Sequence, residues 1–355
     1  MIVIDAHLDL SWNALNWNRD LTRPVAEIRS LEAGMNARNR GRNTVAFPEL
    51  RRADVAVCLA TVLSRASRRN DDKLDYRNQE IAYAMAQGQL AYYRVMEAQG
   101  QLRMLKDWPS LSAHITNWKG EKNQSASLGF ILSMEGADPI VSPDQTRQWW
   151  DDGLRVVGLA HYGVSAYAHG TAAAGGLTGK GQDLLKAMDE TGMILDVTHL
   201  ADDSFWQAVK LFQGPVLASH NNCRALVPDD RQFSDDQIRY LIERDAVIGA
   251  AFDAWMLYPG WVRGETSNSV VGIEAVVDHI DHVCQLAGNA RHSAIGSDLD
   301  GGFGTEQCPH GLDTIVDLQQ IPGLLAKRGY SDGDVEGIMH GNWLRFFEKA
   351  WTKPR

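Results

Sequence analysis

The chain has 355 residues, of which 44% are hydrophobic and 23% charged, an ordinary composition for a globular protein with a sizeable core. This composition excludes an intrinsically disordered chain. Acidic residues number 45 against 35 basic residues, and the resulting net charge of −10 repels phosphate backbones, so we expect no nucleic-acid partner.

The cysteines and the first residues bear on the cellular compartment. No Cys-x-x-Cys pair is present, so neither a zinc ribbon nor a dithiol redox motif is encoded, and we expect free buried thiols at Cys58, Cys223, Cys284 and Cys308. The chain begins Met1-Ile2-Val3-Ile4-Asp5 and turns polar at once, unlike a secretory signal. No later run is long and apolar enough to span a bilayer. We therefore expect a cytoplasmic protein with no membrane partner.

Eight short apolar runs, each followed by a polar turn and a helical pattern, recur along the chain. They are Ile2–Ala6, Asp54–Val62, Leu128–Met134, Leu154–Ala160, Met193–Thr198, Pro215–Ser219, Ala246–Phe252 and Ser293–Ser297. Continuous hydrophobicity of this kind is typical of parallel strands buried on both faces. The pattern predicts an α/β fold, a TIM-like (β/α)8 barrel, with residues 1–355 as a single domain.

The helical segments between these runs carry recognisable signals. Apolar residues between Ile273 and Cys284 recur at three-and-four spacing and form one stripe. Gly100 and Gly192 each stand where a left-handed glycine would end a helix just before a new strand. The segment Ser331–Lys349 is predicted to form two terminal helices that close the domain.

Two stretches interrupt the alternation of strands and helices. Residues 11–52 form a predicted loop insertion that is rich in arginine, and Tyr162–Lys180 is a loop rich in glycine and alanine. Long loops in compact domains are often lids or binding loops. For the arginines, which are Arg19, Arg23, Arg29, Arg38, Arg40, Arg42, Arg51 and Arg52, a solvated surface segment and a substrate-recognition lid both remain open.

Residues suited to metal binding follow six of the eight apolar runs. They are His7, Asp9, Glu135, His161, His199, His220 and Asp298. In a (β/α)8 barrel the carboxyl ends of the strands converge on one face, where the active sites of such enzymes lie. Each residue alone is better explained as a hydrogen-bonded rim residue or, for Glu135, as a helix cap. Together they indicate a metal site, because charged groups there are costly to desolvate without a cation.

The spacing His7-x-Asp9 places two side chains on the same side of a strand, so both can reach one ion. Imidazoles and carboxylates without a thiolate motif suit zinc or a similar divalent metal. The ligands exceed the needs of one ion. The surplus predicts two ions about 3.5–4 Å apart with a bridging carboxylate and water.

These residues lie in motifs that resemble the membrane dipeptidase family, also called renal dipeptidases, from one end of the chain nearly to the other. Asp5-Ala6-His7-Leu8-Asp9 resembles the family's Asp-Gly-His-Asn-Asp, and Met134-Glu135-Gly136 its Val-Glu-Gly. The further motifs are Gly153-Leu154-Arg155 with Leu159-Ala160-His161, Asp196-Val197-Thr198-His199, Ser219-His220-Asn221, Gly296-Ser297-Asp298-Leu299-Asp300-Gly301 and Asn342-Trp343-Leu344-Arg345-Phe346.

The resemblance implies a role for each matched residue. His7 and Asp9 would hold the first zinc, His199 and His220 the second, and Glu135 would bridge the two. The resemblance also implies that His161 contacts the substrate carbonyl and that Asp298 lies near the bridging water. Arg231 falls where the family binds the free carboxylate of a dipeptide.

The resemblance thus implies a zinc-dependent dipeptidase with two Zn²⁺ per chain, in which a hydroxide between the ions attacks the peptide bond. Asp298 and His161 would be catalytic, and both would bind substrate together with Arg231. Departures from the family concern Ala6, Leu8 and Phe252–Tyr258, and residues 11–52 have no counterpart in the animal enzymes. The oligomeric state, including a homodimer, stays open.

Two alternatives remain. One is another two-metal amidohydrolase-like barrel that acts on lactones, cyclic amides or phosphotriesters. Such barrels usually open with His-x-His and use a modified lysine as the bridge, whereas this chain has His7-x-Asp9 and Glu135. The other is a catalytically inactive metal-binding barrel, against which the presence of both Asp298 and His161 counts.

Overall fold

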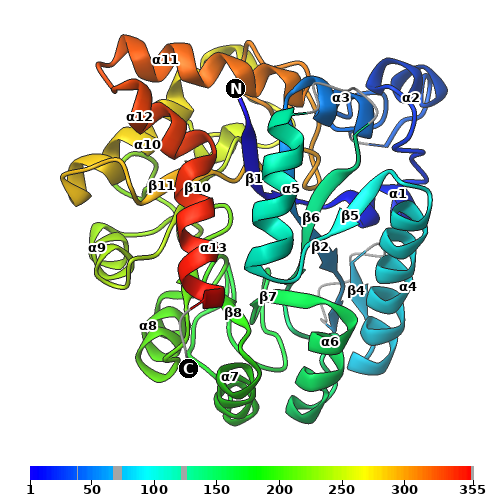
Figure 1. The fold of residues 1–355 in the computed structure, drawn as a ribbon, viewed down its shortest axis with the longest axis vertical. Coiled ribbons are helices and arrows are strands. Elements are labelled where there is room, and N and C mark those ends of the chain that lie inside the picture. The colour runs from blue at the N-terminus through cyan, green and yellow to red at the C-terminus, as the bar shows by residue number, and fades with distance from the viewer. Residues whose placement is uncertain (38, 67–73, 121–125, 353–355) are drawn as a thin grey trace.

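The computed structural model describes residues 1–37, 39–66, 74–120 and 126–352. Parallel strands form a nearly closed barrel with helices around it (Figure 1). The strand order is β10-β11-β1-β2-β6-β7-β8-β9, and a parallel bridge between Ala218 and Ile248 joins the two ends. The strands of this barrel are β1 Val3–Leu8, β2 Val55–Leu63, β6 Leu128–Glu135, β7 Leu154–Gly158, β8 Ile194–Asp196, β9 Val216–Leu217, β10 Ile248–Ala250 and β11 Ser293–Ile295.

The predicted TIM-like (β/α)8 barrel is thereby confirmed, and each of the eight predicted apolar runs overlaps one of these strands. Every residue of β1, β2 and β6 is buried, as expected for strands covered by side chains inside the barrel and by helices outside. Gly296, just after β11, allows the close approach of Ser219, just after β9, because a Cβ on Gly296 would lie 1.8 Å from the carbonyl oxygen of Ser219. The remaining strands are β5 Leu102–Met104, which pairs with β6, and the parallel pair β3 Arg65–Ala66 and β4 Asp75–Tyr76.

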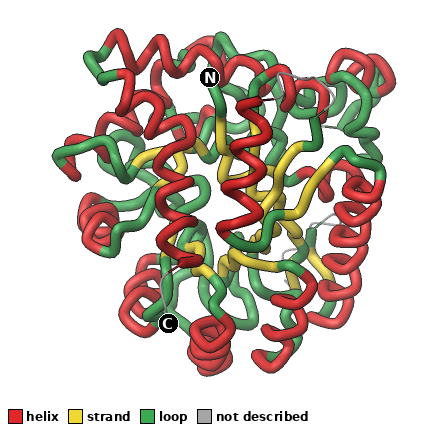
Figure 2. Tube along the Cα trace, in the orientation of Figure 1, coloured by secondary structure: helices red, strands yellow, loops and turns green. Residues whose placement is uncertain are grey.

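Helices enclose the strands on the outside of the barrel (Figure 2). The predicted stripe between Ile273 and Cys284 lies on α10, and its apolar residues are buried. Gly192 ends α7 with a φ of 93°, and Gly100 follows α4 with a φ of 73°. The helices up to this point are α1 Leu10–Asn16, α2 Val25–Leu31, α3 Phe47–Arg52, α4 Gln79–Ala98, α5 Trp108–Gly120, α6 Thr146–Asp152, α7 Gly179–Thr191, α8 Asp202–Leu211, α9 Asp235–Glu243 and α10 Glu274–Ala287, with 3-10 turns at Pro143–Gln145, Ala254–Met256 and Asn268–Val270.

The predicted segment Ser331–Lys349 contains two helices, α12 Asp332–Glu336 and α13 Asn342–Thr352, which the π-helical turn Gly337–Gly341 joins without a break. The 3-10 turn Ile315–Gln320 and α11 Ile321–Lys327 precede them. The side chain of Asn342 donates hydrogen bonds to the carbonyl oxygens of Ala290 and Ser293, at 2.7 and 2.8 Å. Trp343 donates to the carbonyl oxygen of Ile295. These bonds fasten α13 to β11, and α13 lies beside α5 (Figure 1).

Residues 11–52 are not one loop, because the three helices α1, α2 and α3 form within them. Neither interpretation of their arginines holds for Arg19, which is only 3% exposed. Arg19 and Arg40 both pair with Glu32, at 2.9 and 2.7 Å, inside this segment. Arg38 lies outside the described residues. The segment is thus tied together by buried ion pairs.

The described cysteines Cys58, Cys223, Cys284 and Cys308 are all buried and free, as predicted. Burial raises the pKa of each of these thiols above its ordinary value. Among the helices that the structure describes, none combines the length and the apolar character needed to cross a bilayer.

Candidate metal centre

The predicted metal-site residues, together with His161 and Asp298, lie at the carboxyl ends of the barrel strands, and the structure brings them together. His7 lies within β1, Glu135 is the last residue of β6, and the others follow their strands within three residues, whereas Arg231 comes from the longer loop after β9. Among the described residues, three overlapping groups of side chains have ligand atoms within 4.8 Å of one another. They are His7, Asp9 and Glu135; Glu135, His199 and His220; and His7, His220 and Asp298.

Glu135 stands at the centre of this cluster and faces two different sets of ligands. Its Oε1 lies 3.0 Å from Nε2 of His199 and 3.3 Å from Nε2 of His220. Its Oε2 lies 3.7 Å from Nε2 of His7. The two carboxylate oxygens therefore point to opposite halves of the cluster, which is the arrangement that a carboxylate between two cations requires.

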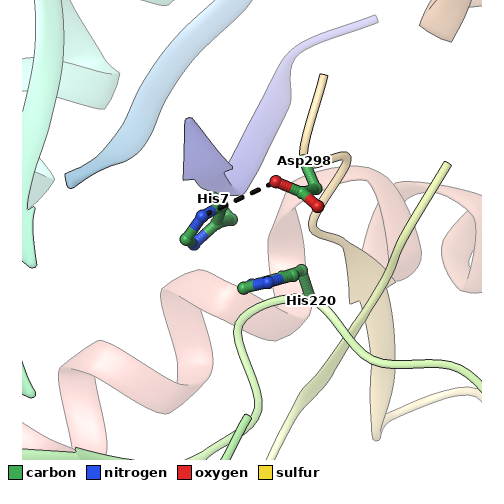
Figure 3. Close-up of side chains that lie close together, drawn as sticks. All are labelled: His7, His220 and Asp298. Atoms are coloured by element: carbon green, nitrogen blue, oxygen red, sulfur yellow. Dashed lines mark ion pairs between the residues drawn. The ribbon is translucent and has the colours of Figure 1, made fainter. Parts of the chain in front are cut away.

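Asp9 and Asp298 flank His7 on β1. Nε2 of His7 lies 3.8 Å from Oδ1 of Asp9 and 3.7 Å from Oδ1 of Asp298. Figure 3 shows His7 and His220 facing each other with Asp298 beside them, and their ring centroids are 3.7 Å apart. The geometry thus places Asp298 close enough to serve either as a ligand or as a base.

Several buried polar atoms of the cluster fit a bound cation. Nε2 of His7 and Oδ1 of Asp9 are buried and have no hydrogen-bond partner among the described residues. Nε2 of His199 and Nε2 of His220 lie 3.2 Å apart, and both face Oε1 of Glu135, so three potential ligand atoms converge on one place. Unpaired buried donors and acceptors are costly. A nitrogen and oxygen ligand set of this kind, without thiolates, suits zinc.

The pKa values of the clustered side chains also favour a bound cation. Burial raises the pKa of Glu135 to about 7 and holds that of Asp298 well above its ordinary value. Burial would lower the pKa of His7, but Glu135, Asp9 and Asp298 together raise it to about 10. The negative charge of the buried carboxylates is therefore not balanced by nearby cations. A proton on His7 balances only part of it.

The buried Asp5 and the partly buried Asp196 fasten the ligand-bearing loops to one another. Oδ1 of Asp5 accepts hydrogen bonds from the backbone N–H groups of His7 and Ser297, at 3.2 and 2.8 Å. Oδ1 of Asp196 does the same for Thr198 and Ser219, at 3.0 and 3.1 Å. The first staple joins the loops of His7 and Asp298, and the second joins those of His199 and His220.

The segment 11–52 supports the part of the site that contains Asp9 and the loop 298–300. The Asn13 amide donates to the carbonyl oxygens of Asp9 and Asp300, at 3.0 and 2.9 Å, and Arg19 donates to Asn13 at 2.7 Å. The Asp300 carboxylate accepts hydrogen bonds from the backbone N–H groups of Thr44 and Val45. Both Asp298 and Asp300 have positive φ, at 58° and 64°. These contacts hold a backbone conformation that L-residues rarely adopt.

The loop Tyr162–Lys180 supplies a partner for one of the candidate ligands. Oγ1 of Thr171 lies 2.9 Å from Nδ1 of His199, whose backbone is strained at a φ of 67°. This hydrogen bond orients the ring so that Nε2 faces Glu135. The glycine- and alanine-rich loop therefore acts as a support for His199.

Replacing Thr171 with valine removes only this hydroxyl group and keeps the shape of the side chain. We expect zinc affinity to fall by ~10- to 100-fold, the usual effect of losing a partner of a ligating histidine. Competition with a chromogenic chelator measures this change. Thr191→Val is the matched control, because Thr191 bonds only to its own helix, at the carbonyl oxygens of Ala187 and Met188. An unchanged affinity in Thr171→Val would show that Thr171 does not orient His199.

A cavity of about 640 Å³ opens beside the cluster. Its walls include four tryptophans and three arginines, namely Trp12, Trp17, Trp255, Trp261, Arg65, Arg231 and Arg263. Arg231 is only 2% exposed and donates to Oδ1 of Asn221 at 2.6 Å and to the carbonyl oxygen of His220 at 2.8 Å. It is therefore not a surface salt bridge. Its guanidinium is held rigidly at the edge of the cavity.

Residues that follow β2 and β10, the two strands for which the sequence suggested no site residue, also reach the site. Arg65 follows β2 and Asp253 follows β10, and both line the cavity. Asp253 accepts hydrogen bonds from the side chain of Gln307. The position of Arg65 and Asp253 after an apolar run was the only sign in the sequence that they belong to the site. Neither residue lies in a motif with the spacing of metal ligands.

Comparisons with known proteins identify the family of the chain. A sequence model described as "Membrane dipeptidase (Peptidase family M19)" matches residues 1–353. The chain is 30% identical over 236 residues to an uncharacterized protein of Klebsiella pneumoniae encoded in the pqqA 5′ region, covering 64% of this chain and 83% of that protein. It is 29% identical over 226 residues to an uncharacterized dipeptidase of Schizosaccharomyces pombe and 30% identical over 226 residues to the dipeptidase aclJ of Aspergillus oryzae. These two alignments cover 62% and 61% of this chain, but only 53% and 50% of the relatives, so the chain spans about half of their length.

Solved structures share the fold. A crystal structure of a metallo peptidase from Rhodobacter sphaeroides, liganded with a phosphinate mimic of the dipeptide L-Ala-D-Ala, matches with a TM-score of 0.79 at 21% identity. A second, described as the dipeptidase AC of family M19, matches with a TM-score of 0.78 at 22% identity. Both matches cover 99% of each chain. At this identity the likeness concerns the fold.

Proposed function

Because the chain belongs to the membrane dipeptidase family of metallopeptidases, we propose that it is a zinc-dependent dipeptidase that cleaves the peptide bond of dipeptides at a two-ion centre. The observation that carries this proposal is the division of the Glu135 carboxylate between two sets of ligands. Oε1 faces His199 and His220, and Oε2 faces His7. This arrangement allows each oxygen of one carboxylate to bind a different cation.

We assign one ion to His7 and Asp9 and the other to His199 and His220, with Glu135 shared by both. When bound, the pair of zinc ions would lower the pKa of a water between them towards ~7 and supply hydroxide at neutral pH. The unpaired Nε2 of His7 and Oδ1 of Asp9 support the first assignment. The hydrogen bonds of His199 to Thr171 and of His220 to Ser219 support the second, because each engages Nδ1 and leaves Nε2 facing Oε1 of Glu135.

Asp298 is proposed as the group that moves the proton. Its carboxylate lies beside the cluster, with Oδ1 3.7 Å from Nε2 of His7, and it lines the substrate cavity. From this place Oδ1 can take the proton of the attacking water and deliver it to the nitrogen of the leaving amine. Its buried surroundings favour a carboxyl group that accepts and releases a proton.

His161 and Arg231 are proposed to bind the substrate on either side of the scissile bond. His161 lines the cavity, and its Nε2 lies 3.8 Å from Oε1 of Glu135, near the proposed ions. A hydrogen bond from this nitrogen would stabilise the carbonyl oxygen as it gains negative charge. The two hydrogen bonds of Arg231 use two of its five N–H donors, and the remaining donors suit a planar carboxylate.

Arg231→Ala is expected to weaken dipeptide binding far more than it slows the chemical step. Losing a charge-assisted pair with the substrate carboxylate raises KM by ~10- to 100-fold, since hydrogen bonds to charged groups contribute ~1.5–3 kcal/mol. Steady-state kinetics on a dipeptide and on its C-terminal amide measure the effect. The amide lacks the carboxylate charge and serves as the internal control. Unchanged dipeptide kinetics would show that the carboxylate binds elsewhere.

Metal analysis combined with a substrate screen tests the whole proposal. The purified protein is loaded with zinc, its metal content is determined, and L-Xaa-L-Xaa and L-Xaa-D-Xaa dipeptides are assayed. The D-series is included because the Rhodobacter sphaeroides enzyme was solved with a mimic of L-Ala-D-Ala. We expect about two zinc ions per chain and hydrolysis of at least one series. If zinc is bound but only lactones, cyclic amides or phosphotriesters are cleaved, the chain is a different two-metal hydrolase.

A further inference from the structure

Arg65 makes an unusual contact with the proposed substrate-binding histidine. Its Nη1 lies 3.0 Å from Nδ1 of His161, although the two residues are 96 positions apart in the sequence. Arg65 is only 6% exposed and comes from β3, directly after the barrel strand β2. Neither the motifs of the chain nor the proposed reaction accounts for an arginine at this place.

The chemistry of the two groups determines where the proton of His161 lies. A guanidinium has only donors and keeps its charge in proteins, so it cannot accept a hydrogen bond from an imidazole N–H. A contact of 3.0 Å therefore requires a lone pair on Nδ1 of His161. The proton of the neutral ring is then on Nε2, the nitrogen that lies 3.8 Å from Oε1 of Glu135.

Both partners of this contact are held in place. Oδ1 of Asp75, whose side chain is 1% exposed, accepts a hydrogen bond from Nε of Arg65 at 2.8 Å. The backbone of His161 is also fixed, because its carbonyl oxygen accepts from the N–H of Thr171. Gly170 passes so close that a Cβ would lie 1.9 Å from the same oxygen. The chain Asp75–Arg65–His161 therefore connects a buried carboxylate to the cavity.

We propose that Arg65, oriented by Asp75, is a positioning residue that holds His161 as the Nε2–H tautomer and so makes it a hydrogen-bond donor towards the substrate carbonyl. The kinetic part of this inference rests on the proposed dipeptidase function, whereas the tautomer itself does not. In this arrangement His161 stabilises negative charge on oxygen and does not exchange its proton with the leaving amine. That exchange is left to Asp298.

Long-range ¹H–¹⁵N correlation spectra of the ¹⁵N-labelled, zinc-free protein read the tautomer directly. The signals of His161 are identified by their absence in His161→Gln. We expect the pattern of a neutral Nε2–H ring in the wild-type protein and a different or mixed pattern in Arg65→Met, which keeps bulk but has no donor. A wild-type ring with its proton on Nδ1, or an unchanged tautomer in Arg65→Met, would overturn the proposal. Should Arg65→Met not fold, Asp75→Asn provides the second test, with a shift in the same direction.

Kinetics of the zinc-loaded variants supply the second readout. We expect kcat of Arg65→Met to fall by ~10- to 100-fold with little change in KM, somewhat less than the ~10²–10³-fold loss on deleting an oxyanion donor. Arg65→Lys keeps a charged donor and should restore part of the rate. Arg345→Met is the matched control, because it removes the 2.7 Å ion pair between Arg345 on α13 and Asp245, neither of which lines the cavity. A change in KM alone would contradict the positioning role. If wild-type protein loaded with zinc cleaves no dipeptide, the proposed function fails, while the spectra still decide the tautomer.

Discussion

Glu135→Ala is expected to lose both zinc ions and to reduce dipeptide hydrolysis to the background rate. Oε1 and Oε2 of Glu135 face His199 and His7, respectively, so its removal takes a ligand from each half of the cluster at once. It also removes the negative charge that offsets the repulsion of two divalent ions about 3.5–4 Å apart. Metal content after dialysis, measured by atomic emission, and hydrolysis at saturating dipeptide test this expectation.

A buried carboxylate outside the site provides the control for Glu135→Ala. Glu49 is 3% exposed and binds the backbone N–H of Val25 and the side chain of Arg52. Glu49→Ala should keep about two zinc ions per chain even if its thermal stability declines. If Glu135→Ala retains both ions, Glu135 is not the shared ligand. If it retains one ion at full occupancy, the two halves of the cluster bind independently.

Asp298→Asn is expected to lower kcat by ~10²–10⁴-fold, the range for removing a general acid–base group. The amide keeps the shape of the carboxylate but cannot take the proton of the attacking water. We expect zinc content to stay near two ions per chain, because His7, Asp9, Glu135, His199 and His220 remain. Single-turnover kinetics, which separate the chemical step from product release, measure the loss.

The metal content of Asp298→Asn separates the two roles that its position allows. A carboxylate oxygen of Asp298 lies within 4.8 Å of the ligand nitrogens of His7 and His220, so a role as ligand is geometrically open. If the variant loses one zinc ion together with its activity, the main role of Asp298 is that of a metal ligand. Full zinc content with a normal kcat would remove Asp298 from the mechanism. Full zinc content with a depressed kcat supports the proton-transfer role.

The tight side-chain supports around the cluster suggest why this site tolerates strained backbone. His199, Asp298 and Asp300 all have positive φ, and His199 and Asp300 are held by hydrogen bonds from other segments. Strain of this kind costs about 1–3 kcal/mol per residue and persists only where neighbouring contacts compensate. The staples at Asp5 and Asp196 and the brace from Asn13 supply such contacts.

Much of the barrel and the composition of the site followed from local pattern. Continuous Val, Ile and Leu runs predicted the strands, because a strand buried on both faces consists mostly of apolar residues. The parallel arrangement then placed the residues after those runs at one end of the barrel, so that His7, Glu135 and Asp298 were expected together. Segment 11–52 was harder, since its short helices carry few periodic apolar residues and its arginines resemble solvent-exposed ones.

Sequence by itself thus predicted that the candidate metal ligands meet, because in a parallel barrel the carboxyl ends of all the strands lie on one face. Only the tertiary structure decided how those residues are supported. The contacts of Arg65 with His161, of Asp196 with Ser219 and of Asn13 with Asp300 join segments that are far apart in the chain. Such contacts depend on the paths of loops and on side-chain rotamers, which have no periodicity, and they become visible only when the barrel has brought the loops together.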